Sequence, residues 1–184
     1  MNKQQTPGFT RATWALMAVF FLPLLLASVL YMARDHWSLP TKQHGELINP
    51  PIEVQTLPLT TENGEPWQFD QEPLLWRMLL VRPDCVDDLC QLQLAKLNSI
   101  HEATGKDFKR VGSLLITTSL DIDQKLIENF NYFNWLILPQ SDLLTNGIYI
   151  MDPNGYIILH YLLDAPAKDM LEDLRHLLRA SQIG

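Results

Sequence analysis

Two cysteines, Cys85 and Cys90, are the residues of this 184-residue chain best suited to do chemistry. They are its only cysteines and lie in the segment PDCVDDLC, with four residues between them. Such a pair can form a redox disulfide, can offer two thiolates to a soft metal such as Cu(I), or can be two buried apolar side chains. The two cysteines alone do not distinguish between these three roles, which depend on the helices and strands that position the pair.

The spacing of the pair limits how a disulfide can form. Residues five apart along an α-helix are separated by about 7.5 Å of rise, more than the roughly 7 Å between Cα atoms that a disulfide spans. A disulfide can therefore close only if Cys85 and its neighbours leave the helix and fold back over its end, which Pro83 and the loop position allow. A helix N-terminus lowers a thiol pKa, but the carboxylates of Asp84, Asp87 and Asp88 oppose this, so strong thiolate activation is not predicted.

The segments after residue 73 alternate between strand and helix periodicity. Short apolar stretches predict strands, and apolar residues three or four apart predict helices. The predicted strands are 74–81, 110–120, 135–139 and a hairpin within 147–162, and the predicted helices are 87–105, 121–133 and 166–180. This order is that of an α/β, thioredoxin-like fold. It places Cys85 in the loop after a central strand and Cys90 in the first turns of the next helix.

Local signals mark the ends and faces of these elements. Gly105 predicts the end of the first helix, Asp121 is a candidate cap for the second, and the segment DPNG at 152–155 predicts the hairpin turn. The predicted apolar face of the first helix holds Leu89, Leu92, Leu97 and Ile100, and that of the last helix holds Met170, Leu171, Leu174, Leu177 and Leu178.

Residues 12–33, ATWALMAVFFLPLLLASVLYMA, contain no charged residue and are long enough for the roughly 20 residues that a bilayer requires. Pro23 in the middle is tolerated in a membrane helix. A cleaved signal peptide is the alternative, but its apolar region usually has about 7 to 15 residues and an A-x-A-like site after it, which is missing here. We therefore predict an uncleaved transmembrane helix. The short preceding tail favours a cytoplasmic N-terminus, which places the remaining chain where disulfides persist.

The predicted organisation is a cytoplasmic tail at 1–11, a transmembrane helix at 12–33, an extended Pro-rich arm at 34–73 and a thioredoxin-like domain at 74–184. Prolines interrupt any helix in the arm, which carries the segment HGELINPP and a candidate hairpin turn at Asn63-Gly64. The formal net charge of −7 argues against nucleic acid as a partner. The sequence has no Gly-rich phosphate loop, and the lack of a C-x-x-C motif weakens a reading as a general disulfide reductase.

Three segments behind the apolar helix carry a family resemblance: PDCVDDLC, IYIMDPNGYIILHY and AKDMLEDLRHLLRA. Together they resemble the Sco/SenC family of cytochrome oxidase assembly proteins, and more closely small proteobacterial membrane proteins encoded near haem-copper oxidase genes. The resemblance implies a thioredoxin fold, a bacterial inner-membrane anchor with a periplasmic domain, and copper held by two cysteines and a histidine. It implies that Cys85 and Cys90 are the sulfur ligands, and that the partner is a cytochrome oxidase subunit or assembly factor.

Two features differ from the family pattern. The family has C-x3-C where this chain has C-x4-C, and Thr145-Asn146-Gly147 stands where the family has histidine. The other candidate donors are His44, His101, His160, Met78 and Met151. We therefore predict an extracytoplasmic assembly protein that uses thiol-disulfide or copper chemistry at Cys85 and Cys90. The alternative is a binding module that has lost the metal site, and an enzymatic activity other than thiol exchange is not predicted.

Overall fold

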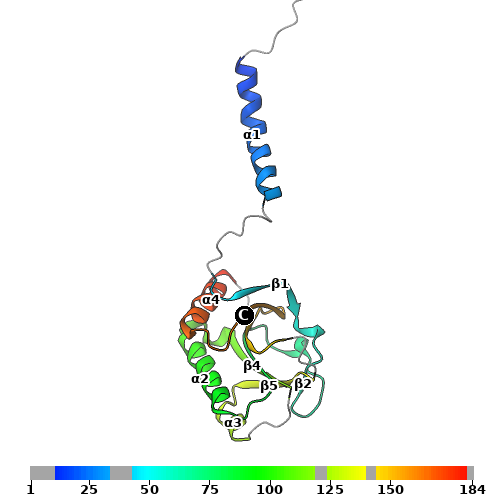
Figure 1. Cartoon of the computed structure of the whole chain (residues 1–184), viewed down its shortest axis with the longest axis vertical. Coiled ribbons are helices and arrows are strands. Elements are labelled where there is room, and N and C mark those ends of the chain that lie inside the picture. Colours follow the sequence, from blue (N-terminus) through cyan, green and yellow to red (C-terminus); the bar gives the residue numbers. More distant parts are fainter. Residues whose placement is uncertain (1–10, 34–42, 119–123, 140–143, 182–184) are drawn as a thin grey trace, which may run out of the picture. The chain divides into compact units, whose positions relative to one another are not determined.

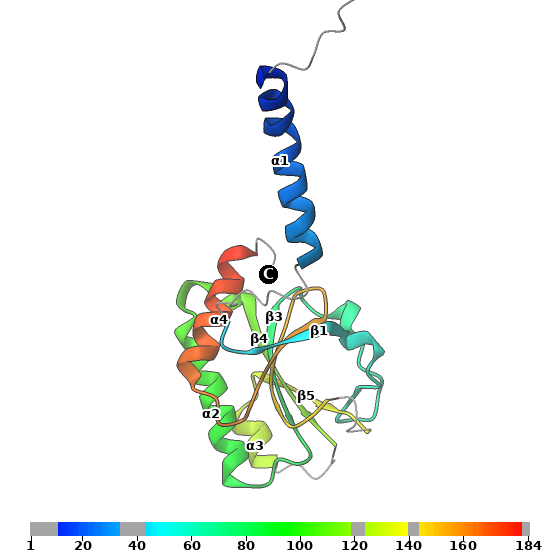
Figure 2. The same cartoon turned by 45° about the horizontal axis from the view of Figure 1, so that its top comes forward.

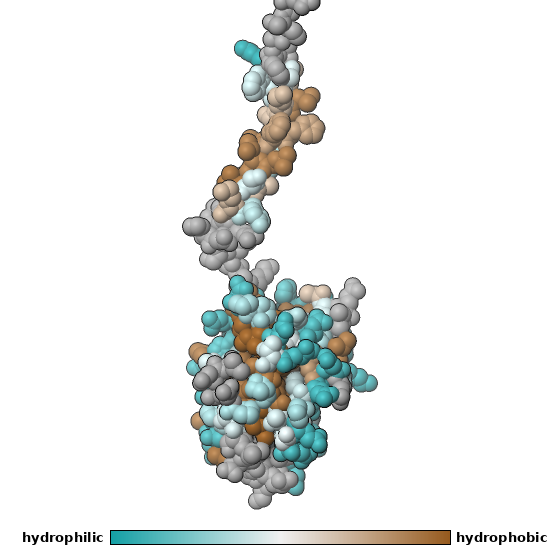
Figure 3. All heavy atoms as spheres, turned by 90° about the vertical axis from the view of Figure 1, so that its right-hand side faces the viewer, coloured by the Kyte–Doolittle hydropathy of each residue, from teal (hydrophilic) through white to brown (hydrophobic). Residues whose placement is uncertain are grey.

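Helix α1, Arg11–Ala33, is the described part of the first of two structural units, Met1–Lys42 and Gln43–Gly184. The computed structural model describes residues 11–33, 43–118, 124–139 and 144–181. Residues 11–32 form a helix long and apolar enough to cross a membrane, and its side chains are largely brown on the face that Figure 3 shows. Pro23 lies inside the helix without ending it. The helix predicted at 12–33 is thus present.

A seven-stranded mixed sheet forms the centre of the second unit (Figure 1). Its strands are β1 (Glu46–Glu53), β2 (Thr60–Thr61), β3 (Trp76–Arg82), β4 (Val111–Thr117), β5 (Phe133–Ile137), β6 (Gly147–Met151) and β7 (Tyr156–Tyr161). Their order is β1-β7-β6-β3-β4-β5-β2. Strands β3, β4 and β5 are parallel, and the remaining neighbours are antiparallel. This is the predicted α/β, thioredoxin-like arrangement.

Three helices cover one face of the sheet (Figure 2): α2 (Asp88–Ala103), α3 (Gln124–Asn129) and α4 (Ala167–Ala180). Alternate strand residues such as Met78 and Leu80 face these helices, because side chains alternate between the two faces of a strand. Leu174 of α4 is fully buried against them. The helix-side core also contains both cysteines, so the candidate chemistry lies on this face.

The segment between β1 and β3 covers the opposite face of the sheet. It contains the short 3-10 helices η2 (Val54–Thr56) and η3 (Phe69–Gln71), whose apolar residues Val54 and Phe69 pack on Leu79 and Tyr149. Residues 46–71 thus contribute strands and a second core, whereas the sequence predicted an extended arm with a hairpin turn at Asn63-Gly64. Prolines exclude a helix there but allow edge strands and short turns. Residues 34–42 of the predicted arm lie outside the described residues. The domain boundary at residue 73 stays a prediction.

The structure confirms most of the local signals. Gly105 follows α2 with φ of 62°, Gly155 turns the hairpin with φ of 89°, and Gly64 has φ of 79° in the turn after β2. A third 3-10 helix, η4 (Gly105–Arg110), leads into β4. The predicted cap Asp121 lies outside the described residues. The stripe of α4 is confirmed, since Met170, Leu174 and Leu178 are buried, and Leu171 and Leu177 are partly buried against the core.

The predicted apolar face of α2 is wrong at two positions. Leu89 and Leu92 are 60% and 64% exposed, whereas Cys90 and Leu94 are fully buried. Leu97 and Ile100 are buried as predicted. The helix begins only at Asp88, and its first turn is oriented by the cysteine loop, so Cys90 rather than Leu89 starts the buried stripe.

A buried carboxylate fastens the start of β1 to the domain. Asp173 of α4 accepts hydrogen bonds from the backbone N–H groups of His44 and Gly45 at 2.8 and 2.9 Å and from the Tyr161 hydroxyl at 2.7 Å. A Cβ atom on Gly45 would lie 2.5 Å from Cζ of Tyr161. The glycine of the HGELINPP segment is therefore explained by this close approach.

Candidate functional site

The cysteine loop joins the end of β3 to the start of α2. Cys85 and Cys90 form a disulfide with 5.3 Å between their Cα atoms. Because α2 begins at Asp88, Cys85 lies outside the helix and folds back over its first turn, as the spacing predicted. Both side chains are fully buried, whereas Val86 between them is 63% exposed. A loop with an exposed tip thus covers a buried pair of sulfur atoms.

Asp87 connects this loop to the helix. Its Oδ1 accepts a hydrogen bond from the Cys90 N–H at 2.8 Å, which caps α2, and its Oδ2 accepts one from Arg82 Nη2 at 3.0 Å. The hydrogen bond from Cys90 N–H is the main cause that holds the pKa of Asp87 below its ordinary value, and Arg82 adds to it. Asp87 therefore uses the N–H group that would otherwise favour an anion near Cys90.

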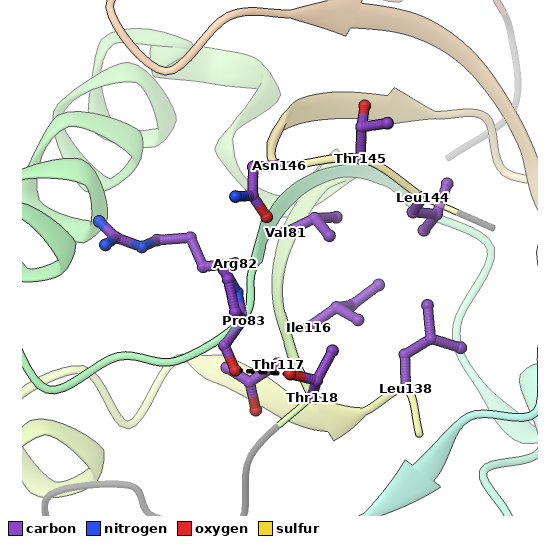
Figure 4. A pocket seen from close by; sticks show the side chains of 10 residues that line it. All are labelled: Val81, Arg82, Pro83, Ile116, Thr117, Thr118, Leu138, Leu144, Thr145 and Asn146. Atoms are coloured by element: carbon purple, nitrogen blue, oxygen red, sulfur yellow. Dashed lines mark hydrogen bonds between the residues drawn. The ribbon is translucent and has the colours of Figure 1, made fainter. Parts of the chain in front are cut away.

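A cavity of about 320 Å³ lies at the carboxyl ends of the parallel strands, next to Arg82 and Pro83, where the cysteine loop begins (Figure 4). Its apolar lining belongs to the core on the opposite face of the sheet from the cysteines. Arg82 and Pro83 form one wall, Thr117 and Thr118 another, and Asn146 stands where β6 begins. Thr118 donates from its N–H and its hydroxyl to the Pro83 carbonyl, at 3.1 and 2.9 Å. The remaining lining is mainly apolar, formed by Val81, Ile116, Leu138, Leu144 and Thr145. The cavity can accept an apolar side chain with a polar group at its edge.

Arg82 is a site residue that the sequence analysis missed. It lines the cavity and also binds Asp87, so it links the cavity to the start of α2. The available signal was its position as the last residue of a buried strand directly before the cysteine loop. Charged residues at carboxyl ends of such strands commonly face a ligand crevice.

The three histidine candidates lie away from the cysteines. His101 Nε2 is 2.9 Å from the Phe108 carbonyl and its ring stacks on Phe108. His160 contacts Tyr149, a residue of the core on the opposite face of the sheet from the cysteines, and its Nδ1 lies 3.6 Å from Glu46. His44 lies beside Asp169 and Glu172 of α4.

The methionine candidates are core residues. Met151 belongs to the core on the opposite face, and Met78 is buried in the helix-side core that contains the cysteines. Within the described ranges, no group of three or more His, Cys, Asp or Glu side chains could hold a metal ion. Thiolates suit Cu(I), but the described residues supply only the two sulfurs of the pair and no third donor of the family type. A three-ligand copper site does not fit these residues.

A family model described as "Transmembrane-like, thioredoxin-like, C-terminal domain" matches residues 76–181. That match covers more than half of the chain and includes the cysteine loop, the hairpin and α4. No curated protein matches the sequence.

Several solved structures have a similar fold. Copper-bound ScoI of Arabidopsis thaliana is 13% identical, with a TM-score of 0.54 over 74% of this chain and 99% of that one. Apo Sco1 of Thermus thermophilus is 16% identical, with a TM-score of 0.54 over 76% and 99%. BsSco, described as having a disulfide switch and as a member of the Sco family of cytochrome c oxidase assembly proteins, is 11% identical, with a TM-score of 0.51 over 72% and 96%. At these identities the likeness shows the thioredoxin-like fold.

Proposed function

This chain belongs to the family of transmembrane-like, thioredoxin-like C-terminal domains, and we propose that it assists cytochrome oxidase assembly by thiol-disulfide exchange at Cys85 and Cys90. The observation that carries the proposal is the disulfide between these residues in the loop that joins β3 to α2, a loop whose tip at Val86 is exposed. The Sco proteins of similar fold support the pathway, since one of them is described as a cytochrome c oxidase assembly protein with a disulfide switch.

The exchange proceeds in two steps with balanced electrons. A thiolate of a partner dithiol attacks one sulfur of the Cys85–Cys90 disulfide, which forms a mixed disulfide and releases the other cysteine as a thiolate. The second partner thiol then loses its proton, attacks the mixed disulfide and leaves the partner oxidised. Two electrons and two protons end on Cys85 and Cys90, and the reverse sequence reduces the partner. The attacking thiol must reach a buried sulfur, so the exposed tip of the cysteine loop must move during the reaction.

Copper delivery is the second candidate, supported by the copper bound in the Arabidopsis relative. Only the reduced pair can bind Cu(I), because a disulfide offers no thiolate. Titration of Cu(I) into the full chain against a chromophoric chelator, with reduced and oxidised samples side by side, tests this candidate. One-to-one binding in the reduced sample alone supports copper delivery, and the absence of competition in both samples contradicts it.

We further propose that the domain lies in the periplasm of a bacterial cell, behind an inner-membrane anchor. A long apolar helix and the "transmembrane-like" description of the family support this placement. The partner is a cytochrome oxidase subunit or assembly factor.

The Cys85→Ser/Cys90→Ser variant tests the function in the host cell. If the proposal is correct, cells with this variant assemble less active oxidase although the protein accumulates to its normal level. The exposed substitution Val86→Ser is the matched control in the same loop and should leave assembly intact. Normal oxidase with the double variant would instead favour a docking module without redox or metal chemistry.

A further inference from the structure

A second cavity, of about 440 Å³, lies at the opposite end of the parallel strands from the cysteine loop. Its walls are residues 133–136 of β5, the turn after β2, and Trp67, Glu72 and Asn131. The cysteine loop follows the last residue of β3, whereas this cavity flanks the first residues of β5, which runs parallel to β3 and β4. The proposed thiol chemistry does not use it.

Two residues that line this cavity carry a buried polar group without a hydrogen-bond partner among the described residues. One is the indole Nε1 of Trp135, a residue only 8% exposed, and the other is the hydroxyl of Thr61. A buried donor without a partner costs about 1 to 3 kcal/mol, so such groups are rare unless a ligand or water meets them. Both groups therefore point to a ligand with hydrogen-bonding atoms.

The cavity also adjoins an incompletely covered strand edge. Strand β2 pairs with only two residues of β5, Thr60 with Ile137 and Thr61 with Leu136, and then turns away at Gly64. Along residues 133–135, no strand in the described part of the chain lies on the outer edge of β5. An uncovered edge is the place where an extended peptide can add as a further strand.

The charge around the cavity is negative. Glu62 and Glu65 are exposed on its rim and form no ion pair with any residue that the structure describes. Glu72, in contrast, accepts hydrogen bonds from Trp67 at 3.1 Å and from buried Arg77 at 3.4 Å, so its charge is already compensated. No Lys or Arg lines the cavity. A cationic side chain fits beside the two free carboxylates and the Trp67 ring.

We propose that this cavity binds an extended segment of a partner protein that carries a Lys or Arg side chain. The segment adds beside residues 133–135 of β5, one of its backbone carbonyls accepts from Trp135 Nε1, and its basic side chain meets Glu62 and Glu65. This site would hold a partner while leaving the cysteine loop, at the other end of the strands, free to react. The proposal depends on neither copper nor the redox state of the cysteines.

Fluorescence anisotropy of a labelled peptide on the full chain in detergent micelles tests the site. The probe is fluorescein-Gly-Thr-Val-Thr-Lys-Val-Thr-Val-amide, labelled at its N-terminus, and its matched control replaces the Lys with Glu. We expect the Lys peptide to bind and the Glu peptide to bind at least tenfold more weakly. Glu62→Lys should weaken the Lys peptide about tenfold, whereas Glu53→Lys, on β1 at the opposite edge of the sheet, should not.

Trp135→Phe provides a second, independent variant because it removes the indole donor and keeps an aromatic ring. It should weaken the Lys peptide about fivefold, as expected for one lost hydrogen bond. Equal binding of the two peptides, or equal loss with Glu62→Lys and Glu53→Lys, would overturn the proposal. So would binding of free lysine amide as tight as that of the Lys peptide, which would indicate a small-amine pocket without strand addition. The absence of peptide binding up to about 1 mM would also overturn it.

Discussion

At the scale of single residues, Asp87 organises the cysteine loop. One carboxylate oxygen caps α2 at the Cys90 N–H and the other binds Arg82, which lines the neighbouring cavity. The cap position was foreseeable, because Asp is a preferred N-cap residue before an apolar helix. The contact with Arg82 was not, since it depends on how the strand end and the loop meet in space.

The pH dependence of stability tests this role of Asp87. Its folded-state pKa is lowered, so its carboxylate stabilises the fold above the unfolded pKa of about 4, and this contribution is lost as the pH falls through the folded-state pKa. Asp87→Asn keeps an acceptor but has no charge. We expect it to unfold at lower urea concentration than wild type at pH 6, with the difference shrinking as the pH falls below about 4. Asp84→Asn, an exposed neighbour, is the control, and a pH-independent difference would contradict this role.

At the scale of elements, periodicity predicted the strands and helices of the domain well, because each element of the helix-side core is amphipathic or wholly apolar. Periodicity failed where contacts with other parts of the chain determine the structure of a segment. The segment after residue 45 was predicted as an extended arm with one hairpin turn, but Val54 and Phe69 cover the second face of the sheet. No periodic pattern in that segment indicated this, because short strands and single turns are too short to show one.

The exposed leucines of α2 give a prediction for stability, because they were expected to be buried and are not. Leu89→Ser/Leu92→Ser should change the free energy of unfolding by less than about 1 kcal/mol, since both side chains remain in water. Leu94→Ala, at a fully buried position of the same helix, should cost about 2 to 5 kcal/mol. Urea unfolding measures both. A double variant as unstable as Leu94→Ala would place the leucines in an interface instead.

The attachment of β1 gives a second prediction for an element. Gly45→Ala would bring a methyl group against the Tyr161 ring and should destabilise the domain by about 1 to 3 kcal/mol. Gly112→Ala in β4 is the matched control, since its Cβ would meet its nearest neighbour, Arg77 Cγ, at 3.5 Å, which is ordinary contact. Thermal unfolding of the two variants should differ clearly. Equal melting temperatures would mean that β1 does not pass Tyr161 as closely as described.

At the scale of the whole molecule, the chain combines a helix able to span a membrane with a thioredoxin-like domain that has its disulfide at one end of the parallel strands. The resemblance in sequence predicted this combination, and the solved Sco structures share its fold. The copper donors did not carry over in the same way. Thr145-Asn146-Gly147 stands where the Sco/SenC resemblance implies a histidine, and the three candidate histidines lie near other elements.

Membrane orientation gives the whole-molecule prediction. A fusion of alkaline phosphatase to the C-terminus should be active and a fusion of green fluorescent protein should be dark, because the domain is proposed to lie outside the cytoplasm, where disulfides persist. The same fusions to a chain that begins at residue 43 provide the control and should reverse both signals. A bright fluorescent fusion to the full chain would contradict the proposed orientation.

Cys85 and Cys90 are proposed to exchange electrons with a partner while the domain stays folded. The most direct measurement equilibrates the full chain in glutathione buffers of graded ratio, traps free thiols with a maleimide and counts them by mass spectrometry. We expect both cysteines to become labelled together in one two-electron transition, at ratios where far-ultraviolet circular dichroism shows the native fold. Labelling that appears only after the domain is unfolded by urea would show a purely structural disulfide and contradict the account.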